Sequence, residues 1–322
     1  MVFLVFFEPE VFAQADENGD YARKALISVI HDFLQNCLVC DFIDYSFLCE
    51  AIGEKVKAMS ETFDRTCIKK LLMSLKTKNR FVGCLKYDYS GEKSEFEMLL
   101  EQCATIPLDI ALLTQKKADA HFACTTLSDY SSTDFKGCQS KAASEGETVL
   151  PQEERSPGDF FSRCFHAAFR YSSKIEVCDR LFGKQFGDNY KFSIAEFYRW
   201  LGQEMKDPRS VNMIIHCGLP GTSDRECTAA FFLDELKKAR DSGSPGMPVK
   251  VQFYDSDNKS VSLPHERFII TEQFCFDIGR GMDFLDFKTR KNRDTKIKLS
   301  SKVDSLKLLE YYAGSKKAAY QI

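Results

Sequence analysis

The sequence predicts a mixed α/β protein with two domains, of which the first is rich in helices. The chain has 322 residues, enough for two domains of roughly 100–200 residues each. Its apolar fraction of 44% and charged fraction of 28% are typical of a globular protein with a substantial core. Short apolar runs alternate with segments whose apolar residues recur at helical spacing, which is the pattern of an α/β fold.

The N-terminal half, 1–131, opens with MVFLVFF, an apolar run that predicts a buried strand. A helix is expected over 20–38, where six apolar residues share one face: Ala25, Leu26, Val29, Ile30, Phe33 and Leu34. The expected elements that follow are helices over most of 39–59 and over 62–77, a strand over 79–88, a helix over 95–103 and a strand over 109–114.

A linker or long surface loop is expected at 132–159. This stretch is rich in Ser, Gly, Glu, Lys and Pro and has few large apolar residues. It would separate the first domain from a second one at 160–322.

In the second domain the alternation of expected strands and helices is clearer. Strands are expected over 174–183, 211–218, 249–255, 266–271 and 274–279, with helices over 193–205 and 224–243. The order β-α-β-α-β-β-β implies right-handed crossovers and a mostly parallel sheet, with 266–271 and 274–279 paired as neighbours.

The composition also indicates in which cellular compartment the protein is expected. No run of about 18 apolar residues exists, so we expect no transmembrane segment. The N-terminus lacks the basic region of a signal peptide. The 13 cysteines are scattered, and several lie in apolar runs, such as Cys178 and Cys217. This usage favours a reducing cytoplasm over a disulfide framework.

Charge is distributed unevenly along the chain. The net charge is −3, but the segment 288–322 holds ten Lys/Arg and three Asp/Glu, a net charge of +7. A basic segment of this kind suggests nucleic acid or another polyanion as a partner, and a solvated polar face is the alternative explanation.

The residues best suited to chemistry follow the pattern His265-x-Arg267-x4-Glu272-x6-Gly279. On a strand, His265 and Arg267 would point to the same side, since side chains alternate. A histidine can attack phosphorus, and a guanidinium can hold phosphate oxygens in a forked contact. A carboxylate can orient the imidazole, and a glycine turn can bring backbone N–H groups to an anion.

This spacing resembles the HxK(x4)D(x6)G motif of the phospholipase D-like superfamily. LPHERFIITEQFCFDIGRGMDF is most similar to the His-x-Arg and Gly-x-Gly-x-Asp segment of the C-terminal phospholipase D-like domain of MIT-domain proteins. The resemblance covers about 174–312. It implies a phospholipase D-like mixed sheet with flanking helices in the second domain, and leaves the first domain unassigned.

The resemblance also implies roles for individual residues. His265 would be the phosphorylated nucleophile, Arg267 the phosphate clamp and Glu272 the orienting carboxylate of a metal-independent phosphodiesterase that needs no cofactor. The expected phosphate-binding residues are Gly279, Arg280, Gly281, Thr222 and Ser223. Because the chain has one copy of the motif, catalysis would require a homodimer.

Three interpretations of the motif are open. The first is a working phosphodiesterase or nuclease directed at nucleic acid, as in bacterial antiviral defence or a mobile element. The second is a degenerate site that binds a protein, nucleic acid or lipid head group, and the third is a pair of purely structural strands. The motif departs from the superfamily pattern at Arg267 and Glu272, where lysine and aspartate are usual, and it lacks the Ser and Asn that often follow the glycine.

Other candidates are weaker. The loop 216–226 precedes a helix whose N-terminus could hold an anion, and His216 could act as a second acid, although a satisfied core histidine is the alternative.

Cys37 and Cys40 have zinc-like spacing without a second pair, so no metal is expected there. A cluster of Asp119, His121 and Cys124 likewise has no partner group. The acids after strand-like runs could hold Mg²⁺ as in a PIN-like nuclease, or serve as caps and surface charges: Glu8, Glu10, Asp41, Asp44, Asp88 and Asp119.

Overall fold

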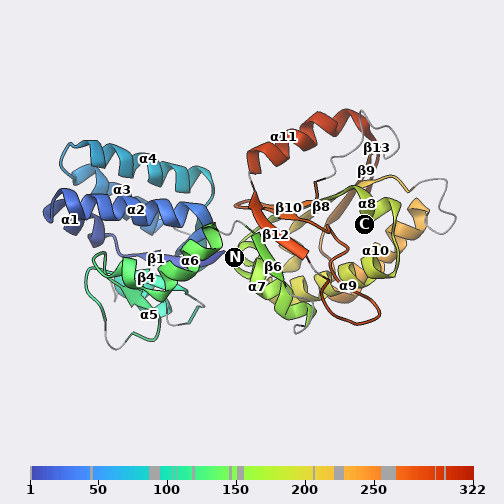
Figure 1. Ribbon diagram of the computed structural model, residues 1–322, viewed down its shortest axis with the longest axis horizontal. Helices are drawn as coiled ribbons and strands as arrows, with labels where there is room; N and C mark the ends of the chain where they lie inside the picture. The colour runs from blue at the N-terminus through green and yellow to red at the C-terminus, as the bar shows by residue number, and fades with distance from the viewer. Residues whose placement is uncertain are drawn as a thin grey trace. The chain divides into compact units, whose positions relative to one another are not determined.

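The computed structural model describes residues 2–43, 46–86, 95–103, 105–106, 108–117, 120–144, 147–150, 156–205, 207–220, 228–254, 266–293, 295–300 and 302–322. The chain divides into two compact units, Met1–Glu145 and Gly146–Ile322. Both combine helices with a sheet, which confirms the mixed α/β class (Figure 1). Among the described residues, no helix is both long and apolar enough to cross a membrane.

The N-terminal unit is built on a five-stranded sheet with the order β3-β2-β1-β4-β5, whose neighbours are all parallel. Its strands are β1 (Phe3–Phe7), β2 (Cys37–Phe42), β3 (Phe81–Leu85), β4 (Ile110–Leu112) and β5 (Cys124–Thr125). Its helices are α1 (Glu10–Glu17), α2 (Asp20–Asn36), α3 (Phe47–Ala58), α4 (Phe63–Thr77), α5 (Glu95–Cys103) and α6 (Asp134–Ser144). The chain builds outward from β1 to β3 and then returns to β4 beside β1, which makes this a doubly wound sheet.

The strand β2 differs from the sequence-based prediction, which placed helix over both 20–38 and most of 39–59. CLVCDF is fully buried between β1 and β3. A strand buried on both faces lacks polar alternation, so a short apolar run cannot be distinguished from a helix segment by its periodicity.

Ordered elements also occupy the expected linker at 132–159: α6, β6 (Glu147–Leu150) and the start of α7. Helix α6 packs on α2 mainly through polar groups. Lys136 Nζ lies 2.5 Å from Asp32 Oδ2, and the Gln139 amide donates to the Asp32 carbonyl at 3.1 Å. The Phe135 ring lies edge-on to Phe33. The low apolar content of the segment therefore reflects a polar helix contact.

The C-terminal unit is built on an eight-stranded mixed sheet with the order β13-β9-β8-β7-β10-β11-β12-β6. The further strands are β7 (Lys174–Asp179), β8 (Asn212–Gly218), β9 (Val249–Tyr254), β10 (Phe268–Thr271), β11 (Cys275–Ile278), β12 (Thr295–Ser300) and β13 (Lys316–Gln321). Its helices are α7 (Pro157–Arg170), α8 (Arg180–Lys184), α9 (Asp188–Glu204), α10 (Ala229–Gly243) and α11 (Lys302–Tyr312).

Only β7, β8 and β9 are parallel to one another; the other pairings are antiparallel, so the expectation of a mostly parallel sheet was wrong. The expected pairing of β10 with β11 is confirmed, with Phe268 opposite Asp277. The additional antiparallel strands come from β6, β12 and β13, whose short or lysine-rich sequences carry little strand signal.

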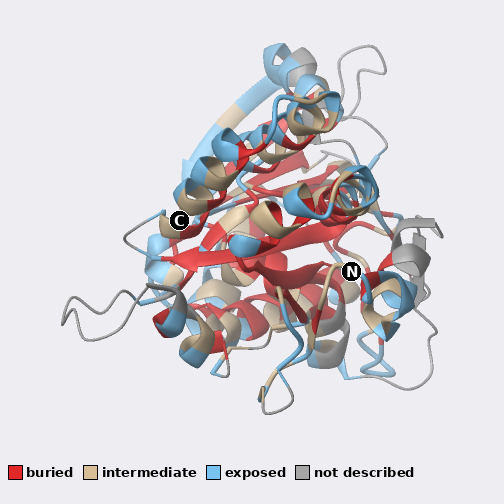
Figure 2. Cartoon of the chain, turned by 90° about the vertical axis from the view of Figure 1, so that its left-hand side faces the viewer, coloured by how far each residue is buried: buried red, intermediate tan, exposed pale blue. Residues whose placement is uncertain are grey.

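Helices cover both faces of this sheet (Figure 1). On one face, aromatic rings of α7 and α10 meet the strands: Phe165 contacts Phe276, and Phe232 contacts Phe253. On the other face, Leu309 of α11 packs in a cluster with Cys178, Tyr254, Phe268, Ile270 and Cys275. Figure 2 shows buried residues concentrated on the strands and on the inner sides of the helices.

Candidate functional site

The structure describes only part of the predicted site. His265, Thr222 and Ser223 lie outside the described residues. Arg267, Glu272, Gly279, Arg280 and Gly281 are described, and they do not form one group.

Arg267 lies directly before β10 and contacts two groups of its own chain. Its Nη1 donates a hydrogen bond to the Gly279 carbonyl at 2.8 Å, across the β10–β11 hairpin. Its Nε lies 3.6 Å from Oδ1 of Asp179, whose side chain is 1% exposed. The guanidinium therefore already has a buried carboxylate as its counter-charge.

Asp179 ends β7 and was not among the predicted site residues. Its carboxylate accepts hydrogen bonds from the backbone N–H of Leu181 at 2.9 Å and of Met282 at 2.8 Å. Burial raises the pKa of Asp179 to about 6, and the Met282 N–H and the Arg267 charge oppose this rise. The signal that could have identified this residue is an acid at the end of an apolar strand, KIEVCD.

Gly281, in the turn that follows β11, lies against the Asp179–Arg267 ion pair. Its φ is +60°, and a Cβ there would lie 2.1 Å from Asp179 Oδ2 and 2.5 Å from Arg267 Cδ. Only glycine fits such a position without displacing the ion pair. We call Asp179, Arg267, Gly279 and Gly281 the Arg267 junction. Arg280, between the two glycines, is half-buried and also has a polar contact.

Glu272 lies just beyond the other end of β10, five residues from Arg267. At about 3.4 Å per residue, the two are separated by about 17 Å along the strand. The Glu272 carboxylate accepts hydrogen bonds from the backbone N–H of Ser173 at 2.7 Å and from its hydroxyl at 2.8 Å. Glu272 therefore anchors the β10–β11 turn to the start of β7, while its predicted role beside His265 stays a prediction because His265 lies outside the described residues.

His216 is the core of a separate buried network on the α11 face of the sheet. Its Nε2 lies 2.9 Å from Glu176 Oε2, and its Nδ1 lies 2.9 Å from the Tyr254 hydroxyl, which donates to Gln252. Lys174 pairs with the other oxygen of Glu176 at 2.7 Å. Burial opposes ionisation of Glu176, but the bonds to His216 and Lys174 prevail and lower its pKa to about 2. This agrees with the interpretation of His216 as a satisfied core histidine.

The exposed cations of 288–322 do not form one patch. Strands β12 and β13 lie six positions apart in the sheet order, about 29 Å at the usual strand spacing. Lys296 and Lys298 lie on β12, whereas Lys316 and Lys317 lie on β13 near the opposite edge. This distribution fits a solvated surface better than one polyanion track.

The candidate acids of the N-terminal unit that the structure describes make contacts that serve local structure. Asp41 caps the start of α3 by accepting hydrogen bonds from Leu48 and Cys49. Glu8 accepts from the Thr114 N–H at 2.5 Å and hydroxyl at 2.8 Å, at the ends of β1 and β4. Glu10 pairs with Lys55 at 3.0 Å. Asp44, Asp88 and Asp119 lie outside the described residues.

No metal centre is formed by the described part of the chain, where no group of three His, Cys, Asp or Glu has suitable geometry. Cys37 and Cys40 are both buried in β2. Burial raises the pKa of each thiol well above its usual value, which disfavours the thiolate that would bind zinc. His121 is exposed, and Cys124 donates to the Lys117 carbonyl at 3.5 Å.

The comparisons with known proteins assign no family to this chain: no family model matches it, and no curated protein matches it significantly.

Proposed function

We propose that the C-terminal unit is a non-catalytic phospholipase D-like domain, which does not cleave phosphodiesters. The observation that carries the proposal is the bonding of Arg267. Its guanidinium is held by the Gly279 carbonyl and by the buried carboxylate of Asp179. A clamp for phosphate must offer its charge and two forked donors to the ligand, and here the charge faces Asp179 while Nη1 is bonded to the Gly279 carbonyl.

Two further contacts support the same proposal. Glu272 is bonded to Ser173 at the other end of β10. His216, the second candidate acid, has both ring nitrogens bonded to buried side chains. Neither group is available to serve a phosphohistidine reaction at Arg267 without first breaking these bonds. Buried strand cysteines such as Cys178 and Cys217 support a reducing compartment, and we propose the cytoplasm.

Hydrolysis assays test this proposal. The purified full chain is incubated with bis(p-nitrophenyl) phosphate, single-stranded DNA and RNA, with and without EDTA, beside a His265→Ala variant. We expect identical background rates for both proteins. EDTA-resistant turnover that disappears in His265→Ala would overturn the proposal and support the enzyme interpretation, in which a second copy completes the site.

A further inference from the structure

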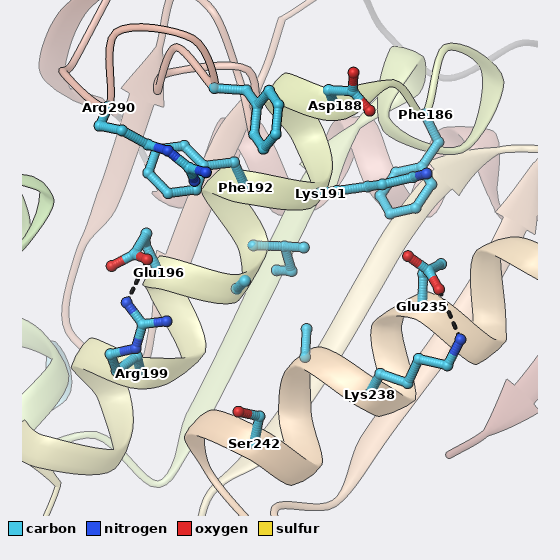
Figure 3. A pocket seen from close by; sticks show the side chains of 14 residues that line it. Phe186, Asp188, Lys191, Phe192, Glu196, Arg199, Glu235, Lys238, Ser242 and Arg290 are labelled. Atoms are coloured by element: carbon cyan, nitrogen blue, oxygen red, sulfur yellow. Dashed lines mark hydrogen bonds and ion pairs between the residues drawn. The ribbon is translucent and has the colours of Figure 1, made fainter.

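A groove of about 420 Å³ lies on the outer side of the α9–α10 helix pair (Figure 3). This volume is within the range of small-molecule sites. Lining residues come from α9, α10, the loop before α9 and the turn at 287–290. None of them belongs to the Arg267 junction, so the groove is a separate feature of the C-terminal unit.

The groove forms because residues of α9 and α10 at its base have small side chains, which leave the space between the two helices unfilled. The half-buried Ala195 of α9 and Ala239 of α10 form its floor with the buried Ile194, and the exposed Ser242 of α10 also lines it. The helices are held close together at one end, where a Cβ on Gly202 would lie 2.0 Å from the Gly243 carbonyl oxygen. Larger apolar side chains, Phe186, Phe192 and Phe287, enclose the other end.

Charged residues line the rim, and several neutralise one another. Glu196 pairs with Arg199 along α9. Lys238 pairs with Glu235 at 2.9 Å along α10 (Figure 3). The lining contains four cations and three carboxylates in all, so its net charge is +1. A weak positive balance of this kind suits a singly charged anion better than a polyanion.

The cations that remain are Lys191 and Arg290. The Arg290 guanidinium lies 4.6 Å from the Phe192 ring centroid and 4.4 Å from that of Phe287, and Lys191 Nζ lies 4.6 Å from that of Phe231. Within the part of the chain that the structure describes, neither cation pairs with a carboxylate. In Figure 3 both lie away from Ser242, on opposite sides of the groove: Arg290 is beside Phe192, and Lys191 is on the side of Phe186 and Asp188. Cation–π contact holds them in place without neutralising their charge.

Arg290 also has a strained backbone conformation. Its φ is +59°, in the left-handed region that non-glycine residues seldom adopt. The turn is fixed by Asp286 Oδ1, which accepts from the N–H of Lys288 and of Thr289. It is fastened to α9 by the Asn189 side chain, which accepts from the Phe287 N–H at 2.9 Å. Strained residues held in this way are concentrated at binding sites.

We propose that this groove binds a small amphipathic carboxylate: an apolar body on the Ala195–Ala239 floor and a single anionic group at Arg290. The inference goes beyond the proposed lack of hydrolysis and does not depend on it, because the two sites share no residue.

Fluorescence titration of the full chain with 1-anilinonaphthalene-8-sulfonate tests the proposal, with the neutral N-phenyl-1-naphthylamine as matched probe. One probe molecule is expected to bind per chain, and decanoate is expected to displace it more effectively than decanol. Arg290→Gly relieves the strained φ while removing the guanidinium, so the fold is retained. We expect it to weaken binding of the sulfonate by about fivefold or more, and binding of the neutral probe by less than about twofold.

Blocking variants test the floor. Ala195→Leu, and independently Ala239→Leu from the other helix, should abolish binding of both probes. The matched controls are Lys237→Gln and Ala230→Leu, which alter exposed α10 positions outside the groove and should leave binding unchanged. Equal effects of Arg290→Gly and Lys237→Gln, undiminished binding to both blocking variants, or equal displacement by decanoate and decanol would overturn the proposal.

Discussion

Arg267 and Asp179 form an ion pair across two neighbouring strands, with Nε 3.6 Å from Oδ1. The pair joins the residue before β10 to the last residue of β7, and the Gly281 turn covers it. Removing one partner from such a pair leaves a buried charge without compensation. The motif that resembles an active site therefore stabilises the junction of three segments.

Gly281→Ala should lower the free energy of unfolding sharply, because the new Cβ would meet Asp179 Oδ2 at 2.1 Å in addition to the strain of a positive φ. Gly246→Ala is the matched control: its φ is +79°, but its Cβ would meet only the Arg209 side chain, at 3.0 Å. We expect Gly281→Ala to cost at least about 2 kcal/mol more than the control, measured by urea unfolding. Equal costs would show that the turn does not press on the ion pair.

Asp179 should make the C-terminal unit less stable as pH rises from about 4 to about 6. Its folded pKa of about 6 exceeds the ordinary aspartate value of 3.8, so the folded state holds the proton more tightly. The tighter proton binding by folded Asp179 stabilises the unit at low pH, and this stabilisation is lost as the carboxyl ionises. The total loss in the free energy of unfolding is on the order of 3 kcal/mol. Asp179→Asn should flatten this slope in urea unfolding between pH 4 and 7. Parallel wild-type and variant curves would contradict the assignment.

His216→Ala should destabilise the unit by about 3 kcal/mol, since it leaves Glu176 and the Tyr254 hydroxyl buried without their shared partner. The folded pKa of Glu176, about 2, is below the ordinary glutamate value of 4.5. Its contribution is therefore full above pH 4.5 and is lost as pH falls toward 2. In His216→Ala this contribution should shrink, because the pKa of Glu176 loses the bond that lowers it, and the lower overall stability should move the acid midpoint to higher pH. Acid unfolding curves provide the measurement, and an unchanged acid midpoint argues against the network.

Glu272→Ala should affect stability alone. The carboxylate accepts hydrogen bonds from the backbone N–H and the hydroxyl of Ser173, and its loss should cost about 1–2 kcal/mol. Part of that cost is shared with Ser173→Ala, so the double variant should cost less than the sum of the two single variants. Full additivity would mean that the two residues do not act together.

The sequence predicted the fold class and most elements whose patterns are local. The β10–β11 hairpin follows from two neighbouring apolar runs, and the helix expected over 224–243 is present as α10. Its N-cap is Thr228, later in the sequence than the expected start. The position of β2 did not follow, because a short run that is buried on all sides has no distinguishing period.

The observed site differs from the predicted one where a residue's partner lies far away in the sequence. Arg267 and Gly279 were identified by spacing, but Asp179 lies 88 positions before Arg267 and is brought beside it only by the pairing of β10 with β7. The groove also escaped detection, since Ala195 and Ala239 look unremarkable until α9 and α10 pack together. Arg290 carried no sequence signal for a left-handed backbone.

The most direct test of a structural role for Arg267 is Arg267→Lys, which restores the lysine of the motif. Lysine lacks the planar fork that reaches both the Gly279 carbonyl and Asp179. The account predicts a lower urea midpoint and no EDTA-resistant hydrolysis of bis(p-nitrophenyl) phosphate. Wild-type stability together with measurable hydrolysis in Arg267→Lys would contradict it.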